Sequence, residues 1–264
     1  MDGQTVLMVG RWRGQPVCAR APNGWMREST NQNIEGQGFS TEAVVRRFDS
    51  WAASYDEDRF GTSYGRYVHA QEEKLLRMWL APAARGRVLS LACGTGRFMD
   101  FATHGIDASN EMAELARKKH PTKTIRVGRA EELPEQGLQF DAIFCLHLFM
   151  HLTPSLMAQI LAGCAQCVPA GGRLIFDIPS ARRRNLTGFR PSGWHAGNAL
   201  THPQVVEILG AWWKLRAWRG ILFFPVHRVP MRLRRLLRPW DDACSATPLK
   251  QWASYLMYCA ERLP

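Results

Sequence analysis

The sequence predicts an α/β fold in which a mostly parallel sheet carries helices on both faces. Across residues 87–177 short apolar runs alternate with stretches of helical periodicity, which is typical of parallel strands joined by crossover helices. One apolar strand runs into a glycine turn at Gly94 and Gly96, and the strand expected at 104–107 ends on Asp107. Ligands of parallel sheets bind beyond the carboxyl ends of the strands, so this turn and carboxylate predict a ligand site.

The elements are expected in a regular order along the chain. Apolar residues at helical spacing predict two helices within 41–80, interrupted by a loop at 61–65. Apolar runs bounded by turn residues predict the strands, and amphipathic stretches between them predict the helices. We expect strands at 87–92, 104–107, 123–128, 140–146, 172–177, 214–224 and 254–261, and helices at 97–103, 109–119, 154–168 and 202–210.

The glycine turn excludes two common nucleotide sites. A dinucleotide fingerprint requires a third glycine where Met99 stands, so NAD is disfavoured. A P-loop requires a lysine followed by serine or threonine to close the turn, and none is present, so ATP is disfavoured too. An acidic residue ending the next strand remains suited to the hydroxyls of a ribose.

Several segments in series carry a family resemblance. The runs 88–96 (VLSLACGTG) and 105–112 (GIDASNEM) resemble the first two motifs of class I S-adenosylmethionine-dependent methyltransferases. Three later segments, at 127–134, 140–152 and 169–177, resemble the family's adenine loop, fourth strand and fifth strand, and 48–56 resembles its lead-in. The resemblance implies a Rossmann-like, seven-stranded sheet whose last strand is antiparallel, and S-adenosyl-L-methionine as the cofactor.

The resemblance also implies which residues contact the cofactor. The expected set comprises Tyr55, Ala92, Cys93, Gly94, Gly96, Asp107, Ala108, Met112, Ala130, Glu131 and Leu146. Three positions depart from the family pattern. Ser90 replaces an acidic residue, Ala92 replaces the first glycine, and Arg129 replaces the aspartate that meets the adenine amine. We expect weakened cofactor binding, or contacts rerouted through Glu131 or backbone carbonyls.

A base that removes the acceptor's proton is optional in methyl transfer, and its candidates are three histidines, with Tyr55 and His227 as further ones. His147 and His151 follow the fourth strand, and His195 lies in a glycine-flanked loop expected at the binding edge. We favour His195, because a Trp-His pair in such a loop has little structural reason to be there. A structural role for His151 at a helix start is an equal alternative.

Composition limits the cellular setting and the domain count. With 264 residues, 46% hydrophobic, the chain suits one large domain over 41–264, preceded by a poorly ordered leader at 1–40. Within it we expect N-terminal helices at 41–80, the cofactor-binding core at 81–180, and substrate-side cap segments at 181–201 and 224–252. The odd number of cysteines predicts a reduced, cytoplasmic setting, and the pair Cys164 and Cys167 is interpreted as core packing, with no metal expected. No apolar run reaches membrane-spanning length.

The net charge of +11 comes largely from one segment without acidic residues, 208–240. Within it, 230–240 reads as a cationic amphipathic helix. Its apolar face could pack on the domain with the arginines solvated, or it could dock on a membrane surface to reach a lipid-like acceptor, giving a possible peripheral membrane association.

The sequence therefore predicts methyl transfer to a small-molecule or lipid-like acceptor at oxygen, carbon or nitrogen. An RNA methyltransferase is the first alternative, encouraged by the arginines. Against nucleic acid, the segment 144–147 lacks the Asn/Asp-Pro-Pro-Tyr/Phe run with which base-methylating relatives clamp a flipped base. A non-catalytic protein that keeps the fold is the second alternative, suggested by Ser90 and Arg129.

Overall fold

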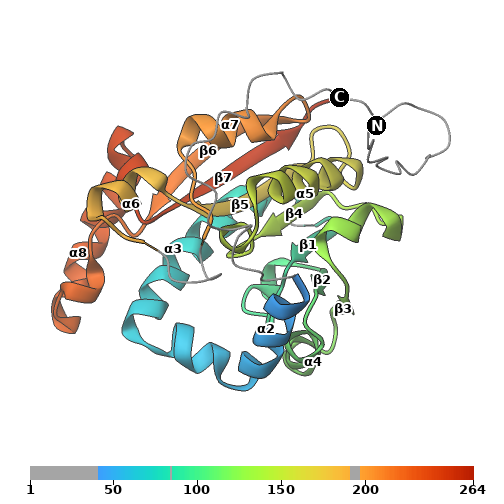
Figure 1. Ribbon diagram of the computed structural model, residues 1–264, viewed down its shortest axis with the longest axis horizontal. Coiled ribbons are helices and arrows are strands. Elements are labelled where there is room, and N and C mark those ends of the chain that lie inside the picture. Colours follow the sequence, from blue (N-terminus) through green and yellow to red (C-terminus); the bar gives the residue numbers. More distant parts are fainter. Residues whose placement is uncertain (1–40, 84, 191–196) are drawn as a thin grey trace, which may run out of the picture.

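The computed structural model describes residues 41–83, 85–190 and 197–264, so the leader expected at 1–40 lies outside it. A seven-stranded sheet of order β3-β2-β1-β4-β5-β7-β6 runs through the molecule (Figure 1). Five neighbouring strands are parallel, and β7 pairs antiparallel with both β5 and β6. The predicted fold class is confirmed. The strands are β1 (Val88–Leu91), β2 (His104–Asp107), β3 (Thr124–Val127), β4 (Ala142–Cys145), β5 (Arg173–Pro179), β6 (Trp213–Ile221) and β7 (Tyr255–Arg262).

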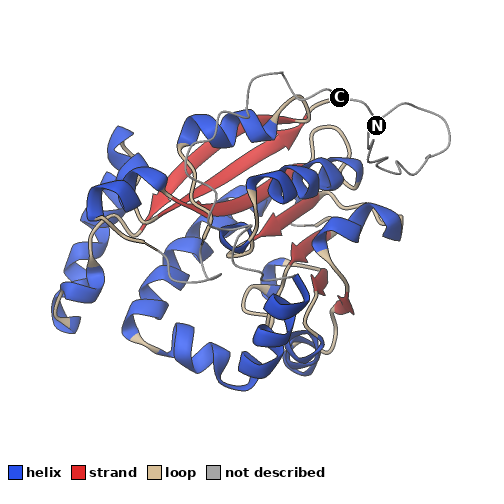
Figure 2. Cartoon of the chain, viewed as in Figure 1, coloured by secondary structure: helices blue, strands red, loops and turns tan. Residues whose placement is uncertain are grey.

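Helices cover both faces of the sheet, as Figure 2 shows. Side chains alternate between the two faces along a strand, so Leu174 and Phe176 of β5 join one core while Ile175 joins the other. α5 and α7 cover the first face, and α3 and α4 cover the second. The helices are α2 (Thr41–Asp56), α3 (Ser63–Leu80), α4 (Asn110–Lys119), α5 (Pro154–Gln166), α6 (Ala181–Thr187), α7 (His202–Leu209) and α8 (Met231–Cys244). Cys164 and Cys167 are buried in the first core, as interpreted.

Two local expectations are wrong. The helix expected at 97–103 is a single 3-10 turn, Met99–Phe101, because the chain is already extended at Ala102 (φ −118°, ψ 154°) where it approaches β2. The loop expected at 61–65 is mostly helical: a π-helical turn, Glu57–Gly61, follows α2, and α3 begins at Ser63.

The connection between β6 and β7 is long and largely helical, and contains α8 and the 3-10 turns η6 (Val226–Arg228) and η7 (Pro248–Trp252). It starts where β6 ends and returns where β7 begins, so it lies at the edge formed by the carboxyl ends of the parallel strands. This is the edge at which the cap segments were expected. No helix in the described part of the chain combines the length and the apolar character needed to cross a membrane.

Candidate active site

The turn after β1 is strained where it borders the ligand site. Ala92, Gly94 and Gly96 all lie in the left-handed region, with φ of 54°, 56° and 87°. A Cβ on Gly96 would come within 2.9 Å of the His120 ring, whereas one on Gly94 would meet no atom within 4 Å. Ala92 costs about 1–2 kcal/mol in this conformation. The open side of Gly94 leaves the backbone accessible to a ligand.

Asp107 ties this turn to the end of β2. Its Oδ2 accepts the Gly94 N–H at 2.7 Å, and its Oδ1 accepts the Ser109 N–H at 2.9 Å. Burial raises the pKa of Asp107 to about 6, although both hydrogen bonds oppose that rise. Each carboxylate oxygen has a second lone pair, so Asp107 can still accept hydrogen bonds from ligand hydroxyls.

A cavity opens beside Asp107 and encloses about 890 Å³ of space not filled by atoms, its open mouth included. Most of the predicted site residues line it: Tyr55, Ala92, Gly94, Asp107, Ala108, Met112, Ala130, Glu131, Leu146, His147 and His151. Gly96 is not among its lining residues and instead supports the turn, since its carbonyl oxygen lies 2.9 Å from Nε2 of His120.

A second, smaller cavity of about 410 Å³ adjoins the first. The two share the lining residues Tyr55, Ala92, Gly94, Leu146 and His147. Cys93, predicted as a cofactor contact, lines this second cavity, and so does Ser90, which replaces the family's acidic residue. Aromatic rings and the Arg97 guanidinium complete the walls, so the second cavity offers aromatic surface beside a basic side chain.

Helix α2 covers the first cavity and contributes Val44, Val45 and Phe48 to its lining. Hydrogen bonds and ion pairs connect α2 to the rest of the domain near both of its ends and in its middle. Ser109 donates to Asp49 at 2.5 Å, and Asp56 accepts from Thr95 and pairs with Lys119.

Arg129 takes part in this fastening. Its Nη2 pairs with Oε1 of Glu42 on α2 at 2.6 Å, and its Nη1 lies 3.8 Å from Glu131. The residue that departs from the family pattern therefore connects the adenine loop to the covering helix. The cavity keeps a carboxylate beside Arg129, because Glu131 also lines it.

A buried ionic cluster lies on the other side of His147. Glu72 of α3 is 2% exposed; its Oε2 accepts from Arg97 at 2.7 Å and its Oε1 lies 2.6 Å from Nε2 of His147. Asp177 of β5 accepts the backbone N–H of His147 at 2.6 Å, and its Oδ2 lies 3.5 Å from Nδ1 of that ring. The Arg97 guanidinium lies 3.9 Å from the centre of the Phe60 ring.

The charges in this cluster balance one another. Burial disfavours ionisation of Glu72, yet the charges of Arg97 and His147 overcome it and lower the pKa of Glu72 to about 2. Burial likewise opposes the charge on His147, but Glu72 and Asp177 raise its pKa. Burial raises the pKa of Asp177, with His147 opposing the rise. The acidic side chains on both sides of the ring therefore favour its protonated form.

This geometry bears on the histidines predicted as bases. Nε2 of His147 lies 2.6 Å from Oε1 of Glu72, and Nδ1 lies 3.5 Å from Oδ2 of Asp177, so the ring is less suited than an uncommitted imidazole to take a proton from a ligand. His151 lines the cavity and packs edge-on against Phe48, with ring centres 5.7 Å apart. His195 lies outside the described residues. The structure thus brings His151 and His147 to the cavity but gives them different surroundings.

The cluster also contains donors of the kinds that bind metals. Ligand atoms of Glu72, His147 and Asp177 lie within 4.8 Å of one another. Because Glu72 already accepts from the Arg97 guanidinium, a metal ion there would be repelled by that fixed cation. The contacts describe an ion-pair network, and the expectation that the protein binds no metal stays a prediction.

Sequence reasoning missed the members of this cluster other than His147. Asp177 carried a usable signal, since it is a carboxylate near the carboxyl end of an apolar strand on the ligand-binding edge. Glu72 carried none, because it lies in a charged helical run, Glu72-Glu73-Lys74, that is typical of a solvated face.

Known proteins resemble this chain in sequence and in fold. Residues 89–176 match the family model of a methyltransferase domain. A protein of Anoxybacillus flavithermus named as an uncharacterized methyltransferase is 28% identical over 136 residues, which cover 49% of this chain and 64% of that one. Another such protein, from Oceanobacillus iheyensis, is 26% identical over 166 residues. The chain therefore spans just under two thirds of the length of the first of these relatives.

Solved structures share the fold at low identity. A Thermotoga maritima methyltransferase, titled a possible histamine N-methyltransferase, superposes with a TM-score of 0.61 at 18% identity and covers 83% of this chain and 99% of its own. A magnesium protoporphyrin IX methyltransferase of Synechocystis, with bound S-adenosylhomocysteine, gives 0.56 at 17% identity and covers 84% and 99%. At such identities the likeness establishes the fold.

Proposed function

We propose that this chain, which belongs to the class I S-adenosylmethionine-dependent methyltransferase family, transfers the methyl group of S-adenosylmethionine to a small-molecule or lipid-like acceptor. The observation that carries the proposal is the Asp107 carboxylate, which ends β2, lines the larger cavity and borders a glycine turn open to a ligand. The carboxylate suits the hydroxyls of a ribose, and the backbone N–H groups of the glycine turn suit the polar groups at the other end of the ligand.

The residues of the two cavities fit the parts of this cofactor. Asp107 would accept hydrogen bonds from the ribose hydroxyls, and Ala108, Met112 and Ala130 supply apolar walls for the adenine. In the smaller cavity, Arg97 offers its cation to the carboxylate of the methionine moiety. When bound, the cofactor supplies an electrophilic methyl on sulfur, which moves to the acceptor as the acceptor loses a proton.

The protein's own part in this reaction is to hold the acceptor in line and to remove that proton where the acceptor requires it. His151, at the wall of the larger cavity, is our candidate for the proton acceptor, and His195 stays a prediction. His147 is better suited to a fixed positive charge, because its ring is held between Glu72 and Asp177.

Isothermal titration with S-adenosylmethionine and S-adenosylhomocysteine tests the cofactor. We expect micromolar binding by the wild type and a loss of at least about 100-fold in Asp107→Ala, since the lost hydrogen bonds to a charged acceptor are each worth roughly 1.5–3 kcal/mol. Asp100→Ala is the matched control, because Asp100 is an exposed carboxylate. An absence of binding in the wild type would contradict the proposal and favour a non-catalytic role.

A transfer assay tests the acceptor class separately. Labelled S-adenosylmethionine would be incubated with phenolic and prenylated small molecules on one side and with total RNA on the other. Label in the small molecules is the expected result. Transfer confined to RNA would contradict the acceptor class and leave the cofactor assignment intact.

A further inference from the structure

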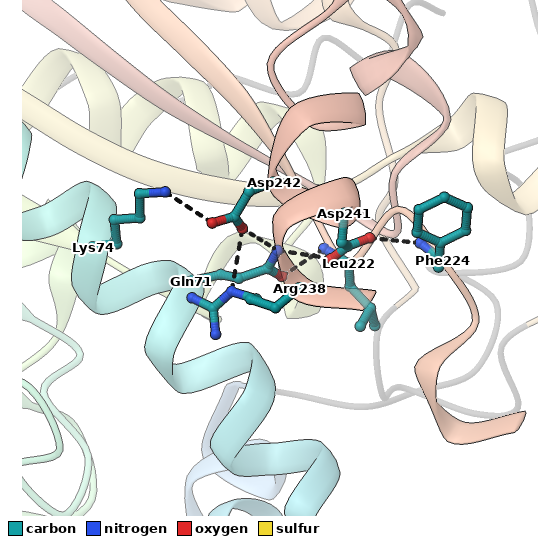
Figure 3. A network of polar contacts seen from close by, with 7 residues as sticks. All are labelled: Gln71, Lys74, Leu222, Phe224, Arg238, Asp241 and Asp242. Atoms are coloured by element: carbon teal, nitrogen blue, oxygen red, sulfur yellow. Dashed lines mark hydrogen bonds and ion pairs between the residues drawn. The ribbon is translucent and has the colours of Figure 1, made fainter. Parts of the chain in front are cut away.

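Helix α8 is fastened to the domain through its polar side (Figure 3). The side-chain amide of Gln71 on α3 donates to Asp241 at 2.7 Å and to Asp242 at 3.0 Å. The same Gln71 accepts the Leu222 N–H at 3.0 Å, and Asp241 accepts the Phe224 N–H at 2.8 Å. Asp241 is completely buried, so this network sets which face of α8 is turned inward.

Two of the four arginines of α8 also face the domain. Arg238 pairs with Asp242 at 3.2 Å and lies over the Tyr67 ring at 5.2 Å from its centre. Arg234 donates to the Ser63 hydroxyl and to the Val229 carbonyl. The interpretation in which α8 packs its apolar face on the domain and solvates its arginines is therefore wrong for most of the helix.

The outward face of α8 is largely apolar. Leu236 and Trp240 are 70% and 69% exposed, and Met231 and Leu233 are exposed as well. At about 100° per residue, Leu233, Leu236 and Trp240 fall within about 60° of one another, and the exposed Arg232 and Arg235 follow on one side, about 40° and 100° from Leu236. Large apolar side chains in solvent, flanked by cations, indicate a binding surface.

Exposed apolar residues also occur on the neighbouring elements. η7 contacts both α8 and α6. Leu249 of η7 and Leu186 and Phe189, on and after α6, are exposed large apolar residues. All three elements belong to the segments expected to form the cap.

We propose that the exposed face of α8 binds an anionic phospholipid bilayer, with Leu233, Leu236 and Trp240 inserted at the interface and Arg232 and Arg235 against the headgroups. Exposed apolar and aromatic side chains with flanking arginines are what interfacial helices use. No acidic residue occurs between 208 and 240, so the segment is complementary to a negative membrane surface.

Other occupants fit these residues less well. RNA would pair with the arginines but would leave the exposed leucines and Trp240 uncovered. A second copy related by a two-fold axis would pack the same face against itself and so gather Arg232 and Arg235 of both copies in one interface, where like charges repel. A bilayer accommodates both groups of residues, because its acyl chains take up the apolar side chains and its anionic headgroups attract the arginines.

Flotation of the full chain with vesicles tests the proposal. We expect binding to phosphatidylcholine vesicles containing phosphatidylserine and little binding to phosphatidylcholine alone. Leu236→Ser with Trp240→Ser should lower the partition coefficient by at least about 100-fold through lost apolar burial. Arg232→Gln with Arg235→Gln should lower it about 25-fold through lost charge attraction.

Two controls distinguish a loss of membrane binding from a loss of folding or of cofactor binding. Val206→Ser with Arg126→Gln changes an exposed apolar residue and an exposed arginine elsewhere, and should bind vesicles as the wild type does. All variants should bind S-adenosylmethionine equally, because none of these residues lines the cavities. The proposal is overturned if the wild type ignores anionic vesicles, if the apolar pair proves dispensable, or if RNA alone is bound through these arginines.

Discussion

The Asp107 site and the Glu72 cluster both lie beside His147, yet they are built in opposite ways. Asp107 is positioned by its own strand and by backbone N–H groups of Gly94 and Ser109, within a short stretch of chain. Glu72 instead meets Arg97 and His147 from a helix that precedes the sheet. The first arrangement depends on turn geometry and the second on how distant elements pack. Substitutions in the first should therefore change ligand affinity, and substitutions in the second should change the free energy of unfolding.

The strongest test of that difference is Glu72→Gln. Removing one charge from a buried, hydrogen-bonded network leaves Arg97 and His147 uncompensated, which we expect to cost about 3–5 kcal/mol of unfolding free energy. Urea denaturation measures the loss. Glu73→Gln removes a neighbouring carboxylate paired with Arg77 on the surface and should cost less than about 0.5 kcal/mol. Equal losses in the two variants would contradict the assignment of the cluster.

The same carboxylate predicts a pH dependence of stability. The pKa of Glu72 is lowered from 4.5 to about 2 in the folded protein, so its contribution is fully present above pH 4.5 and is lost as pH falls toward 2. The difference in unfolding free energy between the wild type and Glu72→Gln should therefore narrow over that window. Denaturation curves at pH 6 and pH 3.5 compare the two conditions, and a constant difference would argue against an ionised Glu72.

Asp107 should instead control cofactor affinity with pH. Because burial raises its pKa to about 6, acidification below that value protonates it and removes the charge that the ribose hydroxyls would contact under the proposed function. We expect the affinity for S-adenosylhomocysteine to be constant above pH 7 and to fall by up to about ten-fold per pH unit below pH 6. Titration calorimetry of wild type and Asp107→Asn checks this, since the amide variant should lack that pH dependence.

The smallest effect is expected where α2 meets the adenine loop. Glu42→Gln removes the partner of Arg129, but Glu42 is more than half exposed, so the pair is worth no more than about 1 kcal/mol. Cofactor affinity should fall at most about five-fold, and the difference should shrink in high salt. A loss that matches Asp107→Ala would instead make Arg129 part of the main binding contacts.

Much of the fold and of the cavity lining could be predicted because those features are local. The alternation of apolar runs and helical stretches predicted the sheet. The strand that ends on Asp107 beside Gly94 predicted the edge at which the cavity lies. The helix expected at 97–103 was wrong, because the chain becomes extended at Ala102 before it enters β2.

Packing alone decided the rest. Glu72 lies in a charged helical run that looks solvated, and it became buried because Arg97 and His147, distant in sequence, came to neutralise it. The inward face of α8 was set by Gln71, whose amide meets Asp241 and Asp242, and hydrophobic patterning points to the opposite face. Periodicity reports which residues share a face, but which face is buried depends on the partner that the tertiary fold supplies.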